Sequence, residues 1–150
     1  MTDSRPATAP AVGGLLRRLL RDAGHQLRNA QNATAVNLEA ARAGAEKNPE
    51  NAASIKPYLE NASRGLEDSV AIAEGIVALC VALLESATSG KLRPIENRQA
   101  GLNALELQMS GDEAARLVQR ARAVAARTGV AVEPCDAGVI LTIPKEHEAN

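Results

Sequence analysis

The 150-residue chain contains no phenylalanine, no tryptophan and a single tyrosine, Tyr58. Aromatic side chains supply much of the apolar area in a typical globular core, and here alanine, leucine and valine have to supply it instead. These small and branched side chains suit closely packed helices, but one chain of this size buries little area with them. The lack of aromatics therefore predicts a helical protein that is completed by a second copy of the chain.

Cysteine, net charge and long apolar runs are scarce as well. Cys80 and Cys135 lie far apart without the spacing of metal ligands, so neither a disulfide nor a metal site is expected. The 17 Lys and Arg residues balance 18 Asp and Glu residues, and no basic patch is interleaved with aromatics, which argues against nucleic acid as a partner. No uninterrupted apolar run reaches the length of about 18 residues that a membrane span needs. We therefore expect a cytoplasmic protein with no membrane partner.

Two long heptad patterns dominate what is present, one from about Leu15 to Ala45 and one from about Pro57 to Ala87. Apolar or small residues recur in both at spacings of three and four, which is typical of helices that pack along a seam. The expected seam residues are Leu16, Leu20, Ala23, Leu27, Ala30, Thr34, Leu38 and Ala41 in the first helix, and Leu59, Ala62, Leu66, Val70, Ala73, Val77, Cys80, Leu84 and Ala87 in the second.

The second helix carries another apolar stripe beside its seam, formed by Ile72, Ile76, Leu79 and Leu83. A helix that is apolar on two sides needs more than one partner. The turn between the helices is expected at residues 48–56, because Pro57 disfavours a helical residue before it. We therefore expect a long antiparallel hairpin that pairs with a second copy to form a dimeric four-helix bundle.

The expected domains are a flexible leader at 1–14, the hairpin at 15–89, a polar linker at 90–103, a small α/β lobe at 104–144 and a charged tail at 145–150. Composition sets the leader and the tail, and Ser89 with the glycine after it marks the end of the hairpin.

Within the lobe, alternating residues from Leu105 to Met109 predict a strand. Ser110 and Glu113 form a capping box that begins a helix ending at Gly129. Two further strands, at 130–132 and 139–143, flank a turn. The predicted fold class is α+β and mostly α, a hairpin followed by a β-α-β-β lobe.

His25 is the only histidine in the helical body of the chain, since the other, His147, lies in the expected tail. With Leu20 and Leu27 at seam positions, the heptad count places His25 opposite the seam, where its side chain meets solvent. The run His25-Gln26-Leu27-Arg28-Asn29 resembles the phosphoacceptor box of histidine-kinase dimerisation domains, in which a solvent-facing histidine lies on the first helix of a hairpin.

The order of parts is also similar to that family, and the lobe resembles a much-shortened version of its ATP-binding domain. Asp136-x-Gly138 echoes an Asp-x-Gly motif there, and the other nucleotide-binding boxes are missing. Gln26 stands where the family usually has an acidic residue, and Ala30 where it has proline. Glutamine cannot act as a base, so phosphorylation from ATP is not expected. The resemblance points to dimeric histidine phosphotransferases with a vestigial ATP-binding lobe.

That resemblance implies a phosphotransfer protein of a bacterial-type two-component phosphorelay, which accepts and donates a phosphoryl group at His25. The partner would be a receiver-domain response regulator or a hybrid kinase that brings its own Mg²⁺, while this chain would bind no cofactor. The alternative is a non-catalytic dimeric scaffold, a pseudokinase-like regulator that binds a kinase or receiver without carrying phosphate. The residues expected to dock the partner are Arg21, Asp22, Gly24, Arg28, Asn29 and Asn32.

Overall fold

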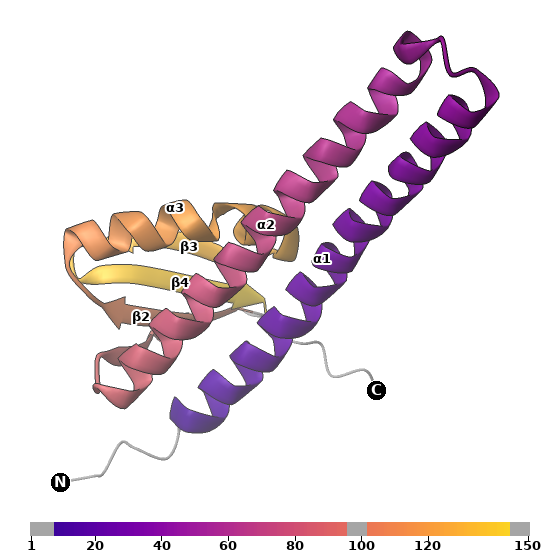
Figure 1. The fold of residues 1–150 in the computed structure, drawn as a ribbon. Helices are drawn as coiled ribbons and strands as arrows, with labels where there is room; N and C mark the ends of the chain where they lie inside the picture. Colours follow the sequence, from indigo (N-terminus) through magenta and orange to yellow (C-terminus); the bar gives the residue numbers. More distant parts are fainter. Residues whose placement is uncertain (1–7, 96–101, 145–150) are drawn as a thin grey trace, which may run out of the picture.

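The computed structural model describes residues 8–95 and 102–144. The elements are, in chain order, α1 (Thr8–Lys47), α2 (Ala52–Thr88), β1 (Leu92–Ile95), β2 (Leu102–Gln108), α3 (Gly111–Thr128), β3 (Ala131–Cys135) and β4 (Gly138–Pro144). Figure 1 shows α1 and α2 side by side in a long hairpin, whose far half projects beyond a lobe formed by α3 and the sheet. The protein is mostly helical with one small antiparallel sheet, as the sequence predicts. The expected tail, residues 1–7 of the leader and residues 96–101 of the linker lie outside the described residues.

Both long helices begin earlier than expected. The first begins at Thr8 rather than near Leu15, so residues 8–14 of the expected leader are helical. Pro10 is tolerated there because the first turn of a helix has no intrahelical acceptor for its N–H groups. The second begins at Ala52 and contains Pro57. The hydrogen bond that Pro57 cannot donate would reach the carbonyl of Ala53, an exposed residue near the tip of the hairpin, where water can replace it.

The buried side of α1 differs from the expected seam in its lower half. Leu19 is 1% exposed, whereas Leu20 is 52% exposed. Nearer the tip of the hairpin, the expected seam residue Leu38 is exposed as well. Ala23 and Ala41 are buried as predicted. The heptad count considered only the packing of α1 on α2, but the lower half of α1 also joins the core of the lobe, and this turns its buried side by about one residue.

The stripe of α2 that is buried is the neighbouring one, not the expected seam. Ile72, Leu79 and Leu83 are almost fully buried. The prediction was wrong for Leu59, Leu66, Val70, Val77, Leu84 and Ala87, which are exposed, and Ala62 is the one expected seam residue of this helix that is fully buried. Both stripes have heptad spacing, so periodicity could not decide which of them packs inside the chain.

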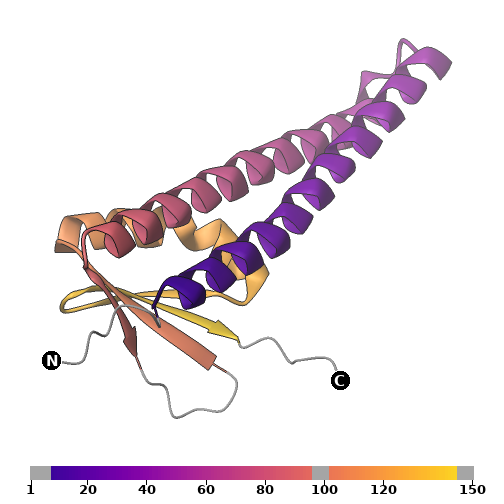
Figure 2. The same ribbon diagram turned by 90° about the horizontal axis from the view of Figure 1, so that it is seen from below.

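The sheet is fully antiparallel with the strand order β1-β2-β4-β3. Leu107 pairs with Val139, and Leu105 pairs with Leu141; all four side chains are buried on one face. Figure 2 shows this small sheet lying against α3 and the near half of the hairpin. The lobe is therefore β-β-α-β-β and not β-α-β-β, because β1 occupies part of the expected linker. A four-residue strand containing proline is a weak signal, and it is tolerated here because β1 is an edge strand.

The hairpin and the lobe approach each other closely at Gly75. A Cβ atom at this position would lie 2.6 Å from Cγ2 of Val124 and 2.9 Å from the carbonyl oxygen of Arg120, both on α3. Val124 is itself fully buried. Only glycine therefore lets the backbones of α2 and α3 approach to this distance.

The capping box at the start of α3 is confirmed. The backbone N–H and the hydroxyl of Ser110 both donate to Oε2 of Glu113 at 3.0 Å, and the hydroxyl accepts from the backbone N–H of Glu113 at 3.3 Å. The hydrogen bond from the backbone of Ser110, followed by that from its side chain, lowers the pKa of Glu113 below 4.5. The helix ends as predicted at Gly129, whose φ of 70° is left-handed.

A glutamate with a lowered pKa in the folded state makes its stability contribution fully above its ordinary pKa and loses it as the pH falls through the folded value. We expect the wild type to lose more stability between about pH 5 and pH 3 than the Glu113→Gln variant does, because the amide does not titrate. Urea unfolding followed by circular dichroism at both pH values measures this difference. Equal slopes for Glu113→Gln and the wild type would contradict the assignment.

Candidate functional site

The imidazole of His25 lies on the solvent side of α1. Ala23, two residues earlier, is fully buried, and at about 100° per residue His25 points to the opposite side of the helix. The residue is exposed, as the sequence predicts. His25 lies in the half of α1 that runs beside the lobe, and the solid packing of Leu19 and Ala23 beneath it gives the histidine a rigid base.

Arg28 is the direct neighbour of the ring. Its Nη2 atom lies 3.4 Å from Nδ1 of His25, one helical turn away. A guanidinium group can only donate, so Nδ1 acts as the acceptor in this long hydrogen bond. The other ring nitrogen, Nε2, makes no hydrogen bond to the described part of the chain, and an exposed imidazole exchanges its tautomers through water. One positive charge therefore stands beside a nucleophilic ring.

Asp22 is engaged by arginines on its own helix. Its Oδ1 atom accepts from Nε of Arg21 at 3.1 Å, and its Oδ2 atom lies 3.5 Å from Nε of Arg18. These contacts hold the carboxylate along the helix surface on the N-terminal side of His25. Asp22 thus sets the positions of two arginines near the histidine.

The other residues expected to dock a partner divide between two sides of α1. Asn29 and Asn32 are exposed, and at 100° per residue they lie on the same side as His25. Gly24 lies about 100° away from His25, nearer to the side that faces α2, and a Cβ atom there would meet nothing within 4 Å. The predicted set is therefore one surface around His25 with the exception of Gly24.

The residue directly after His25 is Gln26, which is half-buried and carries no carboxylate. A base that activates the imidazole for attack on ATP is thus missing from the next position in the chain. A neutral imidazole needs no such base when the phosphoryl donor is already reactive. The arrangement suits a histidine that receives a phosphoryl group from an activated donor.

A second surface feature is an apolar area formed by residues that the heptad patterns predict at the helix seams. Six exposed side chains form it, each between 49% and 62% exposed, and we call this area the open face: Leu20 and Leu38 on α1, and Leu66, Val70, Val77 and Leu84 on α2.

The helical geometry places the open face on the side of the hairpin away from the lobe. Around the axis of α1, Leu19 faces the core, Thr34 faces α2, and Leu20 lies beyond Thr34 on the side away from Leu19. Around the axis of α2, Gly75 faces α3, Gly65 faces α1, and Leu66 lies beyond Gly65 on the side away from Gly75. Both helices therefore present their exposed leucines beyond the line where they touch each other.

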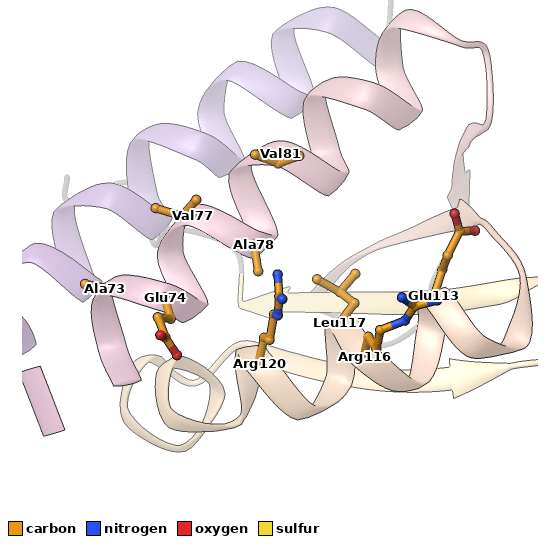
Figure 3. A pocket seen from close by; sticks show the side chains of 9 residues that line it. All are labelled: Ala73, Glu74, Val77, Ala78, Val81, Glu113, Arg116, Leu117 and Arg120. Carbon is orange, nitrogen blue, oxygen red and sulfur yellow. The ribbon is translucent and has the colours of Figure 1, made fainter. Parts of the chain in front are cut away.

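Between α2 and α3 lies an open groove of about 660 Å³. Figure 3 shows Ala78 and Leu117 between the two helices and Arg120 reaching toward α2; Val77 and Val81 on α2 also line the groove. No sequence pattern predicts this groove, because it depends on how α3 docks on α2. It lies between α2 and α3, and His25 projects from the side of α1 away from α2, so the two features are separate.

The Asp136-x-Gly138 motif forms the tight turn between β3 and β4. A Cβ atom on Gly138 would overlap the carbonyl oxygen of Leu107 and lie 2.7 Å from the backbone nitrogen of Met109. Gly138 therefore serves close strand packing, and the motif is explained by the turn alone.

By length and composition, one helix in residues 8–95 and 102–144 could cross a membrane. This is α2, in which an 18-residue window has a mean hydropathy of 2.0 and is 28% buried inside the protein. The same composition is required of a helix that is apolar on two sides.

Comparison of the chain with models of protein families, with curated protein sequences and with solved structures found no match.

Proposed function

We propose that this chain is a dimeric histidine phosphotransfer protein that exchanges a phosphoryl group at His25 with receiver-domain partners. The observation that carries the proposal is the exposed imidazole on the rigid lower half of α1, with the guanidinium of Arg28 3.4 Å from Nδ1. The proposal includes a cytoplasmic location, where such receivers are found.

The dimeric four-helix bundle is supported by the open face. Covering its six half-exposed side chains would remove on the order of 500 Å² of apolar surface per chain, at the upper end of what monomeric proteins expose. With flanking residues the contact would approach the roughly 800 Å² per partner of a standard interface. Leu79 and Leu83, on the other side of α2, are buried, so one apolar stripe of this helix is already covered within the chain. A second copy of the chain would cover the remaining apolar stripe.

The chemical step requires little from this chain. A ring nitrogen of His25 attacks the phosphorus of a receiver phospho-aspartate; the N–P bond forms, the acyl P–O bond breaks, and the aspartate leaves as a carboxylate. The imidazolium proton passes to water. The receiver supplies Mg²⁺, and Arg28 adds positive charge beside the transferring group. The return reaction restores neutral His25.

The second candidate is a dimeric scaffold that binds a kinase or receiver without carrying phosphate. The open face favours it as much as the first candidate, and Gln26 in place of an acidic residue favours it specifically. The two candidates differ only in whether His25 forms a covalent bond to phosphorus.

We expect the His25→Ala variant to take up no acid-labile label from phosphorylated receiver proteins, because its nucleophile is gone. The purified chain is mixed with labelled phospho-receivers, and the label on the chain is measured before and after acid treatment. The matched control is His147→Ala, the removal of the only other histidine, which should retain full labelling. ATP alone should label neither protein.

Label on the wild type that persists in His25→Ala would move the acceptor elsewhere. Absence of label on the wild type with every receiver tested, while the receivers still bind, would reject phosphotransfer and support the scaffold.

A further inference from the structure

The groove between α2 and α3 has no role in the proposed phosphotransfer, and its shape and charges define what it can hold. We infer that it binds an amphipathic α-helix of another protein. That helix would carry an apolar ridge, an acidic residue on one flank and a basic residue on the other. Neither His25 nor its neighbours on α1 line the groove, so the inference is independent of the phosphotransfer.

Two antiparallel helices form the walls of the groove. Nη2 of Arg127 on α3 lies 2.9 Å from Oδ2 of Asp68 on α2. Further along, Gly75 of α2 is packed against the carbonyl oxygen of Arg120 on α3. Residue numbers therefore rise along α2 as they fall along α3.

The surface between the walls is apolar. Leu117 of α3 is buried and lies with the small side chain of Ala78 between the two helices (Figure 3). Ala73, Val77 and Val81 recur along α2 at a spacing of four, over about 12 Å or two helical turns. Such a row of side chains is the ridge against which another helix packs.

The open form of the groove and its side-chain walls favour a helix as the occupant. The backbone N–H and C=O groups of α2 and α3 are already paired within each helix, so an extended segment would find no backbone partners on these walls. A helix brings its own backbone hydrogen bonds and needs only side-chain contacts. A small molecule is retained where most of its surface is enclosed, whereas this groove is open.

Four charged residues line the groove in the described part of the chain, and two of them are engaged within α3. Glu113 belongs to the capping box, and Nε of Arg116 donates to the carbonyl oxygen of Asp112 at 3.2 Å. Glu74 on α2 and Arg120 on α3 form no ion pair or side-chain hydrogen bond within residues 8–95 and 102–144.

These two unpaired charges lie on opposite walls of the groove. Glu74 projects from α2, and Arg120 projects from α3. An occupant that fits both therefore presents a lysine or arginine on the flank that faces α2, and a glutamate or aspartate on the flank that faces α3. The reverse arrangement would oppose like charges on both walls.

A synthetic peptide tests the inference on the full-length chain. The probe is a fluorescein-labelled, end-capped peptide of about 16 residues, long enough to form a helix in isolation. It carries leucine at spacings of three and four, one glutamate on one flank and one lysine on the other. We expect saturable binding by fluorescence anisotropy.

Ala78→Leu fills the space between the two helices and should raise the dissociation constant of the peptide at least tenfold. The control is Ala115→Leu, which is exposed and, two residues before Leu117, lies on the opposite side of α3. It should leave the dissociation constant unchanged. The substitution is placed at Ala78 because Val77, which also lines the groove, belongs to the open face.

An exchange of charges tests Arg120. We expect Arg120→Glu to raise the dissociation constant of the peptide at least fivefold. A second peptide, with lysine in place of the glutamate, should bind Arg120→Glu at least fivefold more tightly than it binds the wild type. Arg64→Glu makes the same change of charge at an exposed residue of α2 outside the groove, and it should alter neither constant.

Absence of saturable binding, binding that a folded Ala78→Leu variant leaves unchanged, or equal effects of Arg120→Glu and Arg64→Glu would each overturn the inference. Circular dichroism and urea unfolding establish that each variant is folded. If Ala78→Leu is not, the exchange of charges at Arg120 decides the question alone.

Discussion

Replacing Gly75 by alanine is expected to lower the free energy of unfolding by about 2 to 3 kcal/mol. The new methyl group would press on Val124 and on the backbone carbonyl of Arg120, and a backbone cannot move aside as a side chain can. The helices α2 and α3 would have to separate, which opens the core that Leu79 and Leu117 share. This loss is expected even though alanine by itself favours a helix over glycine by about 1 kcal/mol.

The matched control is the same substitution at Gly14, where a Cβ atom meets nothing within 4 Å. Gly14→Ala should stabilise the chain by about 0.5 to 1 kcal/mol through helix propensity alone. Urea unfolding of both variants at one protein concentration gives the two values. Hydrogen exchange of the Gly75→Ala variant should show lost protection in α3 while the tip of the hairpin is unchanged. Equal effects of the two substitutions would contradict the close approach of α2 and α3.

Replacing Val77 by glutamate is expected to raise the dissociation constant of the dimer at least 100-fold. Val77 is 62% exposed in the single chain, so its replacement leaves the fold intact. In the bundle the same side chain would be covered, and burying an unpaired carboxylate costs several kcal/mol, where about 1.4 kcal/mol corresponds to a factor of ten. Sedimentation velocity over a range of concentrations measures the constant.

The control for Val77→Glu is Val36→Glu. Val36 is 67% exposed and lies on the polar side of α1, away from the open face. The two variants carry the same change in charge and in helix propensity, so they differ only in the face that they alter. A dimer that tolerates Val77→Glu as well as it tolerates Val36→Glu would not be formed through the open face.

The position of His25 on the surface of α1 could be predicted from local sequence. The exposure of His25 follows from helix periodicity, since it lies two residues from the buried Ala23. The position of Arg28 one turn later follows from the same period. Residue spacing could not predict that Asp22 forms ion pairs with Arg18 and Arg21, because several rotamers of these side chains are compatible with the helix. The separation of Gly24 from the His25 surface also required the direction in which α2 lies.

The sequence by itself determined the two long helices, the capping box of Ser110 and Glu113, the glycine that ends α3 and the strand around Leu107, because each depends on residues close together in the chain. Tertiary structure alone decided that β1 joins the sheet as an edge strand and that α3 packs against Gly75. It also decided which apolar stripe of α2 is buried. Ile72 and Val77 belong to stripes with the same heptad spacing, and only the docking of α1 and the lobe on one stripe leaves the other exposed.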